Sequence, residues 1–401
     1  MKITIIEQPV NNRGDEAAHR SLVRQLNLEF SNAHITVVFI GENPNSVEQM
    51  CVKHPNNRYV NITGKIKGMS RLIPKMLVKY KLFDVALLFP VYRNFIKILK
   101  ESDIIIISPG GINMGGFETW SHLFYINLAL KYNNNVIYYG RSIGPFTEVT
   151  KDNRIFKKRS LEILHKLKFI SLRDSKSMKT LEKLGISYCP TIDTAFLDVP
   201  NVILPKELSG LAGTKYIIFV PNSLTWHPVY RDAQQEIIDD LYISIVKKIL
   251  ENQNDIKIIM LPQLFNSNVN DEQYFKKLKS KINNDKIVVL PETYSSDIQQ
   301  KIISNSKLVI GARYHSIVFA INNNIPFIAL SYEHKMDGLC ELLEIDKMCI
   351  DITGIGKKDS DSEIILTRIQ DVLKEKIHCA DKQKAHNIAM KCFKTTITKL
   401  K

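Results

Sequence analysis

The strongest chemical signal is a cluster of basic and hydroxyl side chains where a strand passes into a helix. A β-branched run at Lys307–Ile310 precedes an expected helix at Tyr314–Asn322, which begins among Arg313, His315 and Ser316. A helix N-terminus presents unpaired N–H groups and partial positive charge, so added cations make it an anion site. Histidine is a common general acid in enzymes, and His315 is the expected general acid here.

A second cation is expected at the same edge of the sheet. The next strand, Pro326–Ser331, leads to Lys335, and ligands of doubly wound folds bind where strands end. Arginine binds two oxygens of a carboxylate or phosphate at once. The two strand ends therefore predict a pocket for a ligand with more than one negative charge.

Carboxylates follow the first strand of the chain. Lys2–Glu7 has the pattern of a strand, and Asp15 and Glu16 open the helical run that ends at Phe30. A carboxylate at this position is suited to accept a proton from a substrate hydroxyl. Capping of the helix explains the same residues equally well. Neither a G-x-G-x-x-G nor a Walker A motif accompanies them, so nucleotide binding gains no support.

A glycine-rich loop follows the β-branched strand Asp103–Ser108. Gly110, Gly111 and two further glycines fall within residues 110–116, and Glu118 lies just beyond them. Glycines let the backbone approach a neighbour closely, and that neighbour is either another loop or a ligand. Glu118 is a further candidate for the general base.

Two arginines follow later strands of the first half. Arg141 lies beyond the strand Val136–Tyr139, and Arg173 lies beyond Ile170–Ser171. Both are expected to contact substrate at the ends of their strands, because the guanidinium group is suited to carboxylates and phosphates. An ordinary Asp–Arg surface pair is the alternative for Arg173.

Strand-like and helix-like segments alternate along the chain, which is the pattern of βαβ units on a parallel sheet. The alternation stops at Asp198–Gly213, which holds two prolines and two glycines, and then restarts. We expect an α/β fold of two Rossmann-like, doubly wound domains facing a cleft. Their bounds are 1–200 and 214–345, followed by a C-terminal helical region at 346–401.

The chain carries 55 Lys and Arg against 41 Asp and Glu, a net charge of +14 over 401 residues. Such a surplus suggests an acidic partner, or merely a lysine-rich host composition. Nine basic residues and one acid, Asp84, fall within Lys65–Lys100 among apolar side chains. This segment is expected either to lie on an anionic membrane surface or to form an ordinary helix pair. No nucleic-acid-binding motif accompanies the charge, so nucleic acid is not an expected partner.

Composition and motif content exclude several further classes of protein. The apolar stretches are far shorter than the roughly 20 residues that a membrane-spanning helix needs. The first residues hold no apolar region of signal-peptide length, so a cytoplasmic location is expected. The six cysteines form no C-x-x-C pair and no cluster with metal-ligand spacing, so no metal is expected.

Taken together, these blocks resemble the polysaccharide pyruvyl transferase family. The matching blocks, in family order, are Asn12–Ala17, the Gly110-Gly111 loop, Gly140–Pro145, Ser171–Ser177, Asp193–Phe196, Arg313–Ser316 and Ile325–Lys335. The resemblance implies domains similar to those of the GT-B glycosyltransferases, with the acceptor on the N-terminal domain and the donor on the C-terminal one. It implies transfer of a pyruvyl group from phosphoenolpyruvate to a sugar, as a ketal, during synthesis of capsules, exopolysaccharides or cell walls.

The resemblance also implies roles for the residues. Arg313 and His315 would bind the phosphate and carboxylate of the donor, with Arg173 opposite them, and phosphoenolpyruvate needs no further cofactor. Further substrate contacts are expected from Lys335, Ser316, Gly110, Gly111 and Arg141. His315 is the acid candidate, and the residue that acts as base stays open among Asp15, Glu16 and Glu118.

The partner implied by the resemblance is a glycan acceptor, lipid-linked or polymeric. The expected location is cytoplasmic, or peripheral at the inner face of the cell membrane through residues 65–100. Two alternatives remain at the level of sequence. One is a GT-B glycosyltransferase that uses a nucleotide sugar, and the other is a non-catalytic protein that binds glycan or membrane. The acceptor sugar, the positions joined by the ketal and the oligomeric state are not indicated by the residues.

Overall fold

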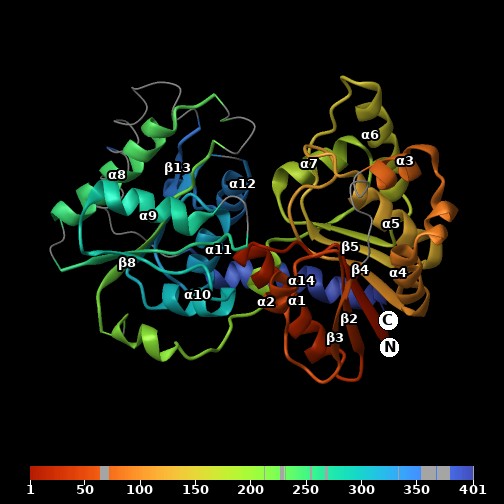
Figure 1. Cartoon of the computed structure of the whole chain (residues 1–401), viewed down its shortest axis with the longest axis horizontal. Coiled ribbons are helices and arrows are strands. Elements are labelled where there is room, and N and C mark those ends of the chain that lie inside the picture. The colour runs from red at the N-terminus through yellow and green to blue at the C-terminus, as the bar shows by residue number, and fades with distance from the viewer. Residues whose placement is uncertain are drawn as a thin grey trace. The chain divides into compact units, whose positions relative to one another are not determined.

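The computed structural model describes residues 1–63, 72–211, 213–225, 230, 232–252, 255–266, 270–332, 334–353, 367 and 380–400. The chain forms two compact units, each built on a parallel sheet with helices (Figure 1). Unit 1 comprises Met1–Val10, Asp15–Asp198 and His386–Lys401, and unit 2 comprises Asn11–Gly14 and Val199–Ala385. The predicted α/β fold with two Rossmann-like halves is confirmed.

Within the described residues, unit 1 holds a seven-stranded parallel sheet in the order β3-β2-β1-β4-β5-β6-β7. The strands are β1 (Lys2–Ile6), β2 (His34–Ile40), β3 (Asn57–Ile62), β4 (Ile104–Ile107), β5 (Val136–Arg141), β6 (Phe169–Leu172) and β7 (Cys189–Pro190). β4 consists of four buried isoleucines. A strand covered on both faces by helices has this continuous apolar pattern, rather than an alternating one.

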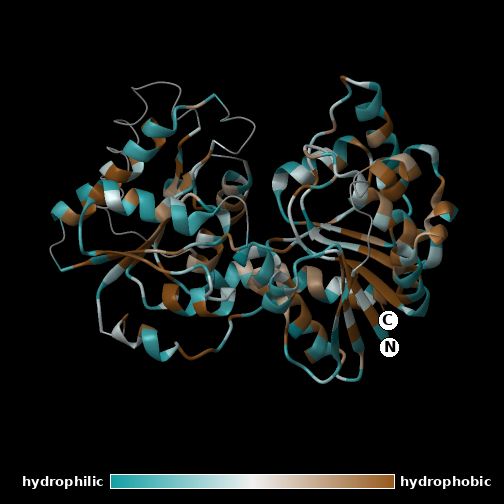
Figure 2. Ribbon diagram, viewed as in Figure 1, coloured by the Kyte–Doolittle hydropathy of each residue, from teal (hydrophilic) through white to brown (hydrophobic). Residues whose placement is uncertain are grey.

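The helices of unit 1 include two short 3-10 segments, labelled η. They are α1 (Arg13–Glu29), α2 (Pro44–Met50), α3 (Leu72–Tyr80), η1 (Phe83–Leu88), α4 (Pro90–Glu101), α5 (Trp120–Tyr132), α6 (Lys151–Leu164), α7 (Ser175–Lys183), η2 (Thr194–Leu197) and, from the C-terminus, α14 (Lys382–Leu400). Figure 2 shows hydrophobic strands inside and helices with one hydrophilic side outside. This division is what a sheet covered by amphipathic helices requires.

Unit 2 repeats the plan with a six-stranded parallel sheet among its described residues, in the order β10-β9-β8-β11-β12-β13. The strands are β8 (Tyr216–Val220), β9 (Lys257–Met260), β10 (Ile287–Val289), β11 (Leu308–Gly311), β12 (Phe327–Ser331) and β13 (Cys349–Asp351). The helical segments are η3 (Lys206–Leu211), α8 (Gln235–Asn252), α9 (Asp271–Ile282), α10 (Ser296–Ser304), α11 (Tyr314–Asn322), α12 (His334–Leu343) and η5 (Asp346–Met348).

The predicted C-terminal helical region at 346–401 is wrong as a separate region. β13 pairs with β12 and extends the sheet of unit 2, whereas α14 packs on unit 1 from His386 onward. The reason is a buried stripe on α14 that includes Ala389, Cys392 and Phe393, together with a hydrogen bond of 2.9 Å from His386 Nδ1 to the Phe196 carbonyl oxygen. Residues 354–366 and 368–379 lie outside the described part of the chain.

Across the residues that the structure describes, no helix combines the length and the apolar character needed to cross a bilayer.

Candidate functional site

A pocket opens in unit 1 where the order of the strands reverses. β1 and β4 are neighbours, and their last residues, Ile6 and Ile107, are paired, while the chain continues from β1 toward β2 on the other side. Doubly wound folds bind their ligands at the carboxyl ends of strands at such a reversal. A pocket of about 370 Å³ lies here. It is lined by Ile6, Glu7, Gln8, Pro9, Val38, Phe39, Ile40, Glu42, Phe95, Asn113, Ser121, Tyr125 and Arg141.

Arg141, which the sequence predicted to bind substrate, forms part of this pocket. Its side chain is buried, and Nη1 donates hydrogen bonds to the main-chain oxygens of Glu7 (3.0 Å) and Ser108 (2.8 Å). Nη2 donates to Asn113 Oδ1 at 2.6 Å. One guanidinium group at the end of β5 therefore holds the segments that follow β1 and β4.

Gly110 is required by this arrangement. A Cβ atom at Gly110 would lie 2.8 Å from Pro9 Cγ and 3.3 Å from the Arg141 guanidinium carbon. By contrast, nothing lies within 4 Å of the Cβ position of Gly111. Gly110 thus lets Arg141 approach the backbone closely, and Gly111 leaves open space beside the loop.

The remaining glycines of the loop meet a second loop. Gly116 N donates to the Pro145 carbonyl oxygen (2.9 Å), and Gly144 N donates to the Met114 carbonyl oxygen (3.0 Å). A Cβ atom at Gly115 would lie 2.1 Å from the carbonyl oxygen of Gly144. Of the two explanations that the sequence left open, close packing of loops accounts for Gly115, Gly116 and Gly144.

An acid–histidine pair borders the pocket, and neither residue is among the site residues predicted from the sequence. His122 of α5 is fully buried, and its Nδ1 lies 2.5 Å from Glu7 Oε2. On its other side, Nε2 lies 3.5 Å from the Tyr138 hydroxyl. Burial, and then the charge of Arg141, lower the pKa of His122, while Glu7 opposes that shift. His122 lies between the Glu7 carboxylate and the Tyr138 hydroxyl.

A second carboxylate, Glu42, lines the same pocket just beyond β2. Burial, and then the charge of Glu7, raise the pKa of Glu42. The backbone of Glu42 is fixed by Asn61, whose Nδ2 donates to the Glu42 carbonyl oxygen at 2.7 Å. Two acids with different surroundings thus face one pocket.

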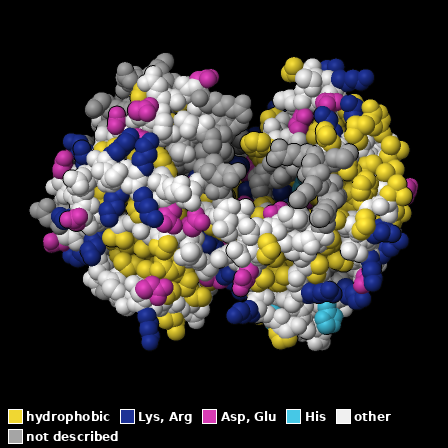
Figure 3. Space-filling view, in the orientation of Figure 1, with side chains coloured by type: hydrophobic (Ala, Val, Ile, Leu, Met, Phe, Trp, Pro, Cys, Tyr) yellow, Lys and Arg dark blue, Asp and Glu magenta, His cyan; other side chains and the backbone are white. Residues whose placement is uncertain are grey.

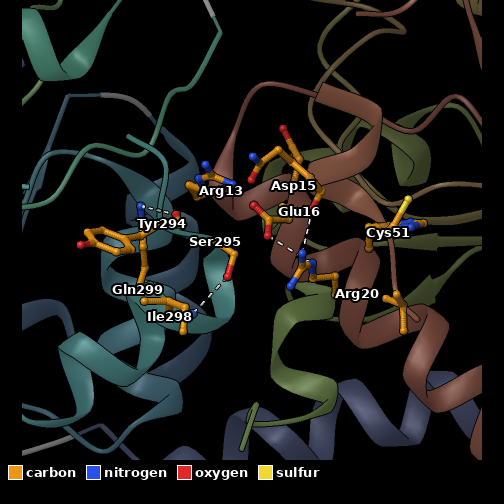
Figure 4. Close-up of polar contacts among 12 residues, drawn as sticks. Arg13, Asp15, Glu16, Arg20, Cys51, Tyr294, Ser295, Ile298 and Gln299 are labelled. Carbon is orange, nitrogen blue, oxygen red and sulfur yellow. Dashed lines mark hydrogen bonds and ion pairs between the residues drawn. The ribbon is translucent and has the colours of Figure 1, made fainter. Parts of the chain in front are cut away.

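The acids that the sequence selected lie elsewhere. The Glu118 carboxylate accepts hydrogen bonds from Asn153 Nδ2 (2.8 Å) and Thr147 Oγ1 (3.3 Å), and Glu118 does not line the pocket. Asp15 lies in the first turn of α1. Glu16 is buried and forms an ion pair with Arg20, with 3.1 Å between Oε1 and Nε (Figure 4). The structure therefore does not bring Glu118 together with Arg141.

Arg173 lies after β6 in a buried ion pair. Its Nη1 donates to Asp193 Oδ2 at 2.7 Å, and its Nε donates to the Ser142 hydroxyl at 3.2 Å. Asp193 also accepts a hydrogen bond from Ala195 N and so begins η2. Arg173 therefore joins three segments of unit 1 at their strand ends, with a buried acid rather than a surface one as its partner.

The basic cluster of unit 2 is organised by a further acid. Arg313 immediately precedes α11, is largely buried, and forms an ion pair with Asp271. The other Asp271 oxygen accepts two backbone hydrogen bonds of 3.1 Å, from Gln263 and Leu264. Asp271 thus fixes the guanidinium group at the carboxyl edge of the sheet.

Ser316 packs against the end of β11. Its hydroxyl donates to the Arg313 carbonyl oxygen at 2.5 Å, and a Cβ atom at Gly311 would lie 2.0 Å from that hydroxyl oxygen. Gly311 therefore makes room for the first turn of α11. Lys335, at the start of α12, is half-buried.

His315 meets a segment from the far N-terminal part of the sequence. Asn11–Gly14 clusters with unit 2, where Arg13 N donates to the Gln263 carbonyl oxygen (2.8 Å) and Phe265 N donates to the Asn11 carbonyl oxygen (3.1 Å). This pairing places Gly14 against the His315 ring.

The Arg13 side chain strengthens that docking. Its guanidinium carbon lies 3.9 Å above the centre of the Phe265 ring, and its Nη2 donates to the Glu292 carbonyl oxygen at 2.5 Å. Figure 4 shows Arg13 beside the loop that carries Tyr294 and Ser295. The motif that follows β1 is therefore split, with Arg13 and Gly14 serving the unit that carries His315.

Sequence comparison decides the family. A sequence model described as polysaccharide pyruvyl transferase matches residues 12–334. The chain belongs to the polysaccharide pyruvyl transferase family. A curated relative, the amylovoran biosynthesis protein AmsJ of Erwinia amylovora, is 24% identical over 381 residues, which cover 88% of this chain and 89% of AmsJ.

Solved structures extend the comparison to the GT-B-type fold. The UDP-GlcNAc 2-epimerase of Neisseria meningitidis, bound to UDP-GlcNAc, is 10% identical with a TM-score of 0.57, and the match covers 100% of both chains. Sucrose-phosphate synthase of Thermosynechococcus elongatus is 11% identical with a TM-score of 0.53, covering 100% of this chain and 94% of that one. At this identity the likeness concerns the fold alone.

The family match covers most of the site described above. Arg141, Arg173, Arg313 and His315 all fall within residues 12–334, whereas Glu7 precedes the matched segment. Among the described residues of this pyruvyl transferase family member, no cluster of three or more His, Cys, Asp or Glu side chains is suited to hold a metal ion.

Proposed function

We propose that this polysaccharide pyruvyl transferase moves the pyruvyl group of phosphoenolpyruvate onto a sugar of an exopolysaccharide or of its lipid-linked precursor. The observation that supports the donor most directly is the cluster of Arg313, His315 and Ser316 at the N-terminus of α11. Phosphoenolpyruvate carries a phosphate and a carboxylate, and a helix N-terminus with an oriented arginine suits such a ligand. No metal or cofactor enters the proposal.

The proposed reaction consumes two hydroxyl groups of one sugar. The methylene carbon of phosphoenolpyruvate gains a proton and becomes a methyl group, while a sugar oxygen bonds to C2. Phosphate leaves, and the second hydroxyl oxygen bonds to the same carbon and closes the ketal. His315 is the proposed acid, because imidazole exchanges protons near neutral pH. Arg313 would stabilise the negative charge of the donor throughout.

Within this proposal each unit binds one of the two substrates. Unit 2 would take the donor through Arg313, His315 and Lys335, and unit 1 would take the acceptor in the pocket beside Arg141. The pocket volume of about 370 Å³ lies within the usual range for small-molecule sites, roughly 300–1,000 Å³. Its walls combine apolar side chains with amide, carboxylate and guanidinium groups, which suits the apolar face and the hydroxyl edge of a sugar ring.

The decisive experiment supplies both candidate donors. Purified protein would be incubated with phosphoenolpyruvate or with nucleotide sugars, and with a panel of p-nitrophenyl and lipid-linked sugars. We expect phosphate release that depends on the acceptor, together with the mass gain of a pyruvate ketal. Release of a nucleoside diphosphate instead would establish the nucleotide-sugar glycosyltransferase alternative. Arg313→Ala is expected to abolish turnover, and full turnover in that variant would contradict the donor assignment.

Contact with an anionic membrane is also proposed, on the described part of the Lys65–Lys100 segment. Residues 64–71 lie outside that part. We define the α3–α4 face as exposed apolar and basic side chains of α3, η1 and α4, together with Leu82, which precedes η1. Its members are Leu72, Met76, Tyr80, Leu82, Leu87, Leu88, Arg93, Lys97 and Lys100. Figure 3 shows hydrophobic side chains gathered over the region of α3, with Lys and Arg along its lower edge.

The cations of the α3–α4 face are suited to bind anionic lipid headgroups, because carboxylates of unit 1 do not neutralise Arg93 and Lys97. Lys75 and Lys79, which lie on α3 but outside the defined face, form ion pairs with Asp152 at 2.6 and 2.7 Å. Arg93 and Lys97 are exposed and form no ion pair with any carboxylate in the described residues. Exposed leucines beside such cations match the apolar and anionic layers of a membrane surface. A lipid-linked acceptor would be presented at that surface.

A further inference from the structure

Glu7 occupies an unusual backbone position in the wall of the unit 1 pocket. It follows the last residue of β1 and has a φ of 60°. A residue with a side chain adopts this left-handed conformation at a cost of about 1–3 kcal/mol, and such strain gathers at functional sites. Contacts with other residues must therefore stabilise the left-handed backbone conformation of Glu7.

Those contacts fix both ends of the residue. Arg141 Nη1 donates to the Glu7 main-chain oxygen at 3.0 Å, and His122 Nδ1 lies 2.5 Å from the carboxylate. Arg141 and His122 are buried, whereas the Glu7 side chain remains 18% exposed and lines the pocket. On its buried side the Glu7 carboxylate is thus oriented by His122, and on its pocket side it is accessible to a ligand.

The groups behind Glu7 form a chain that orients its carboxylate. The Tyr138 hydroxyl lies 3.5 Å from His122 Nε2, so His122 lies between this hydroxyl and the Glu7 carboxylate. A base oriented by a second group, which is itself oriented by a third, is the arrangement by which proton-accepting side chains are activated in enzymes.

We propose that Glu7 is the catalytic base of unit 1, which accepts the proton of a sugar hydroxyl as that oxygen bonds to the donor carbon, and that His122 is its positioning residue. The ligand class is a monosaccharide unit that offers two neighbouring hydroxyl groups. This inference rests on the proposed pyruvyl transfer, and it replaces Asp15 and Glu118 as the base. Of the two hydroxyl protons released per turnover, one balances the proton gained by the new methyl group and the other leaves with phosphate.

The geometry of the other acids supports this choice. Glu118 is held by Asn153 and Thr147 outside the pocket. Glu42 lines the pocket, and Asn61 holds its backbone N–H and carbonyl groups rather than its carboxylate. Glu7 therefore combines access to the pocket with a hydrogen bond that fixes the carboxylate.

Two variants of Glu7 test the proposal. Glu7→Gln keeps the shape and removes the proton-accepting charge. Glu7→Gly removes the whole side chain at a position whose positive φ glycine adopts without strain. We expect kcat to fall about 10²- to 10⁴-fold in both variants, with unchanged affinity for phosphoenolpyruvate. Added formate is expected to restore part of the activity of Glu7→Gly but not of the intact protein.

Matched variants separate the roles. Glu42→Gln, on the same pocket wall, is expected to change the acceptor KM with less than a tenfold effect on kcat. His122→Asn is expected to lower kcat while leaving the acceptor KM within about twofold, a split that general destabilisation of the fold would not produce. Asp15→Asn and Glu118→Gln are expected to retain kcat within about threefold.

The outcomes distinguish this inference from the function on which it rests. Turnover of phosphoenolpyruvate by the unaltered protein, with kcat retained in both Glu7 variants, overturns the base assignment alone. A loss of kcat in Asp15→Asn or Glu118→Gln as large as that expected for Glu7 overturns it as well. Absence of phosphate release by the unaltered protein with every acceptor overturns the proposed function itself.

Discussion

Gly14 and His315 are in direct contact, although 300 residues separate them in the chain. A Cβ atom built on Gly14 would lie 1.8 Å from both Cγ and Nδ1 of the His315 ring. Atoms cannot approach so closely, so any side chain at position 14 must displace the imidazole. The glycine of the N-terminal motif therefore sets the position of the proposed acid.

We expect Gly14→Ala to lower kcat/KM for phosphoenolpyruvate at least tenfold and to destabilise the protein by about 1–3 kcal/mol, because inserting a methyl group into packed structure forces shifts of this cost. Steady-state phosphate release and urea unfolding measure the two effects. Gly210→Ala is the control, since nothing lies within 4 Å of the Cβ position of Gly210. Equal activity of the two variants would show that Gly14 does not position His315.

The buried pair of Arg173 and Asp193 leads to a prediction about stability. Their side chains are 4% and 0% exposed and lie 2.7 Å apart. Removing one partner of a buried pair leaves an uncompensated charge, so Arg173→Met and Asp193→Asn should each lose about 3–5 kcal/mol of unfolding free energy. The double variant should lose less than the sum. If the single variants unfold like the parent protein but raise the KM for phosphoenolpyruvate, Arg173 contacts the donor directly.

The burial of His19 leads us to expect that the free energy of unfolding falls in acid. The ring is buried, with Nε2 3.1 Å from the Tyr59 hydroxyl. Burial, and then the charges of Arg20 and Arg24, lower the pKa of His19 from 6.5 to about 3. Between these values the unfolded chain binds a proton that the folded chain does not, so stability is complete above about pH 6.5 and falls toward pH 3.

The measurement is the urea midpoint of unfolding between pH 7 and pH 5. One such proton accounts for a slope of up to about 1.4 kcal/mol per pH unit. We expect His19→Gln to be less stable at neutral pH but to show a flatter dependence, whereas the exposed His34→Gln should keep the slope of the parent. Identical slopes for all three proteins would contradict the assignment to His19.

The α3–α4 face predicts binding to anionic vesicles. Each Lys or Arg near such a surface contributes about 1 kcal/mol to membrane binding. Replacing Arg93, Lys97 and Lys100 together with glutamate should therefore weaken co-sedimentation with phosphatidylglycerol vesicles at least tenfold. The control replaces three exposed lysines of unit 2 with glutamate, namely Lys247, Lys248 and Lys257. This triple variant changes the net charge equally and should leave vesicle binding unchanged. An equal loss in both triple variants would mean that binding follows net charge and not this face.

The interior of the fold could be predicted from sequence because its strands are continuous apolar runs. β4 is four isoleucines, and β8 reads YIIFV with every residue buried. The edge strands β3 and β13 were missed, since β3 reads NRYVNI and has only Ile62 fully buried. Polar residues are stable on such edges, so no apolar pattern marks them.

The same contrast applies to the site. Arg313, His315 and Ser316 are adjacent in sequence at one strand–helix junction, so their proximity followed from spacing alone. The role of Glu7 depends on Arg141 and on His122, each more than 100 residues away and on different elements. Its positive φ also leaves no trace in residue type, because glutamate rarely adopts it.

The last helix has a consequence for how the protein can be made. The part of α14 from His386 onward is translated after unit 2 yet packs on unit 1. Most of unit 1 therefore emerges from the ribosome early but lacks this helix until α14 has been made. A fragment ending at Asp198 should therefore expose the surface that Ala389, Cys392 and Phe393 cover. Supplying the helix as a separate peptide should complement that fragment, whereas a deletion at the C-terminus damages the half of the protein encoded first.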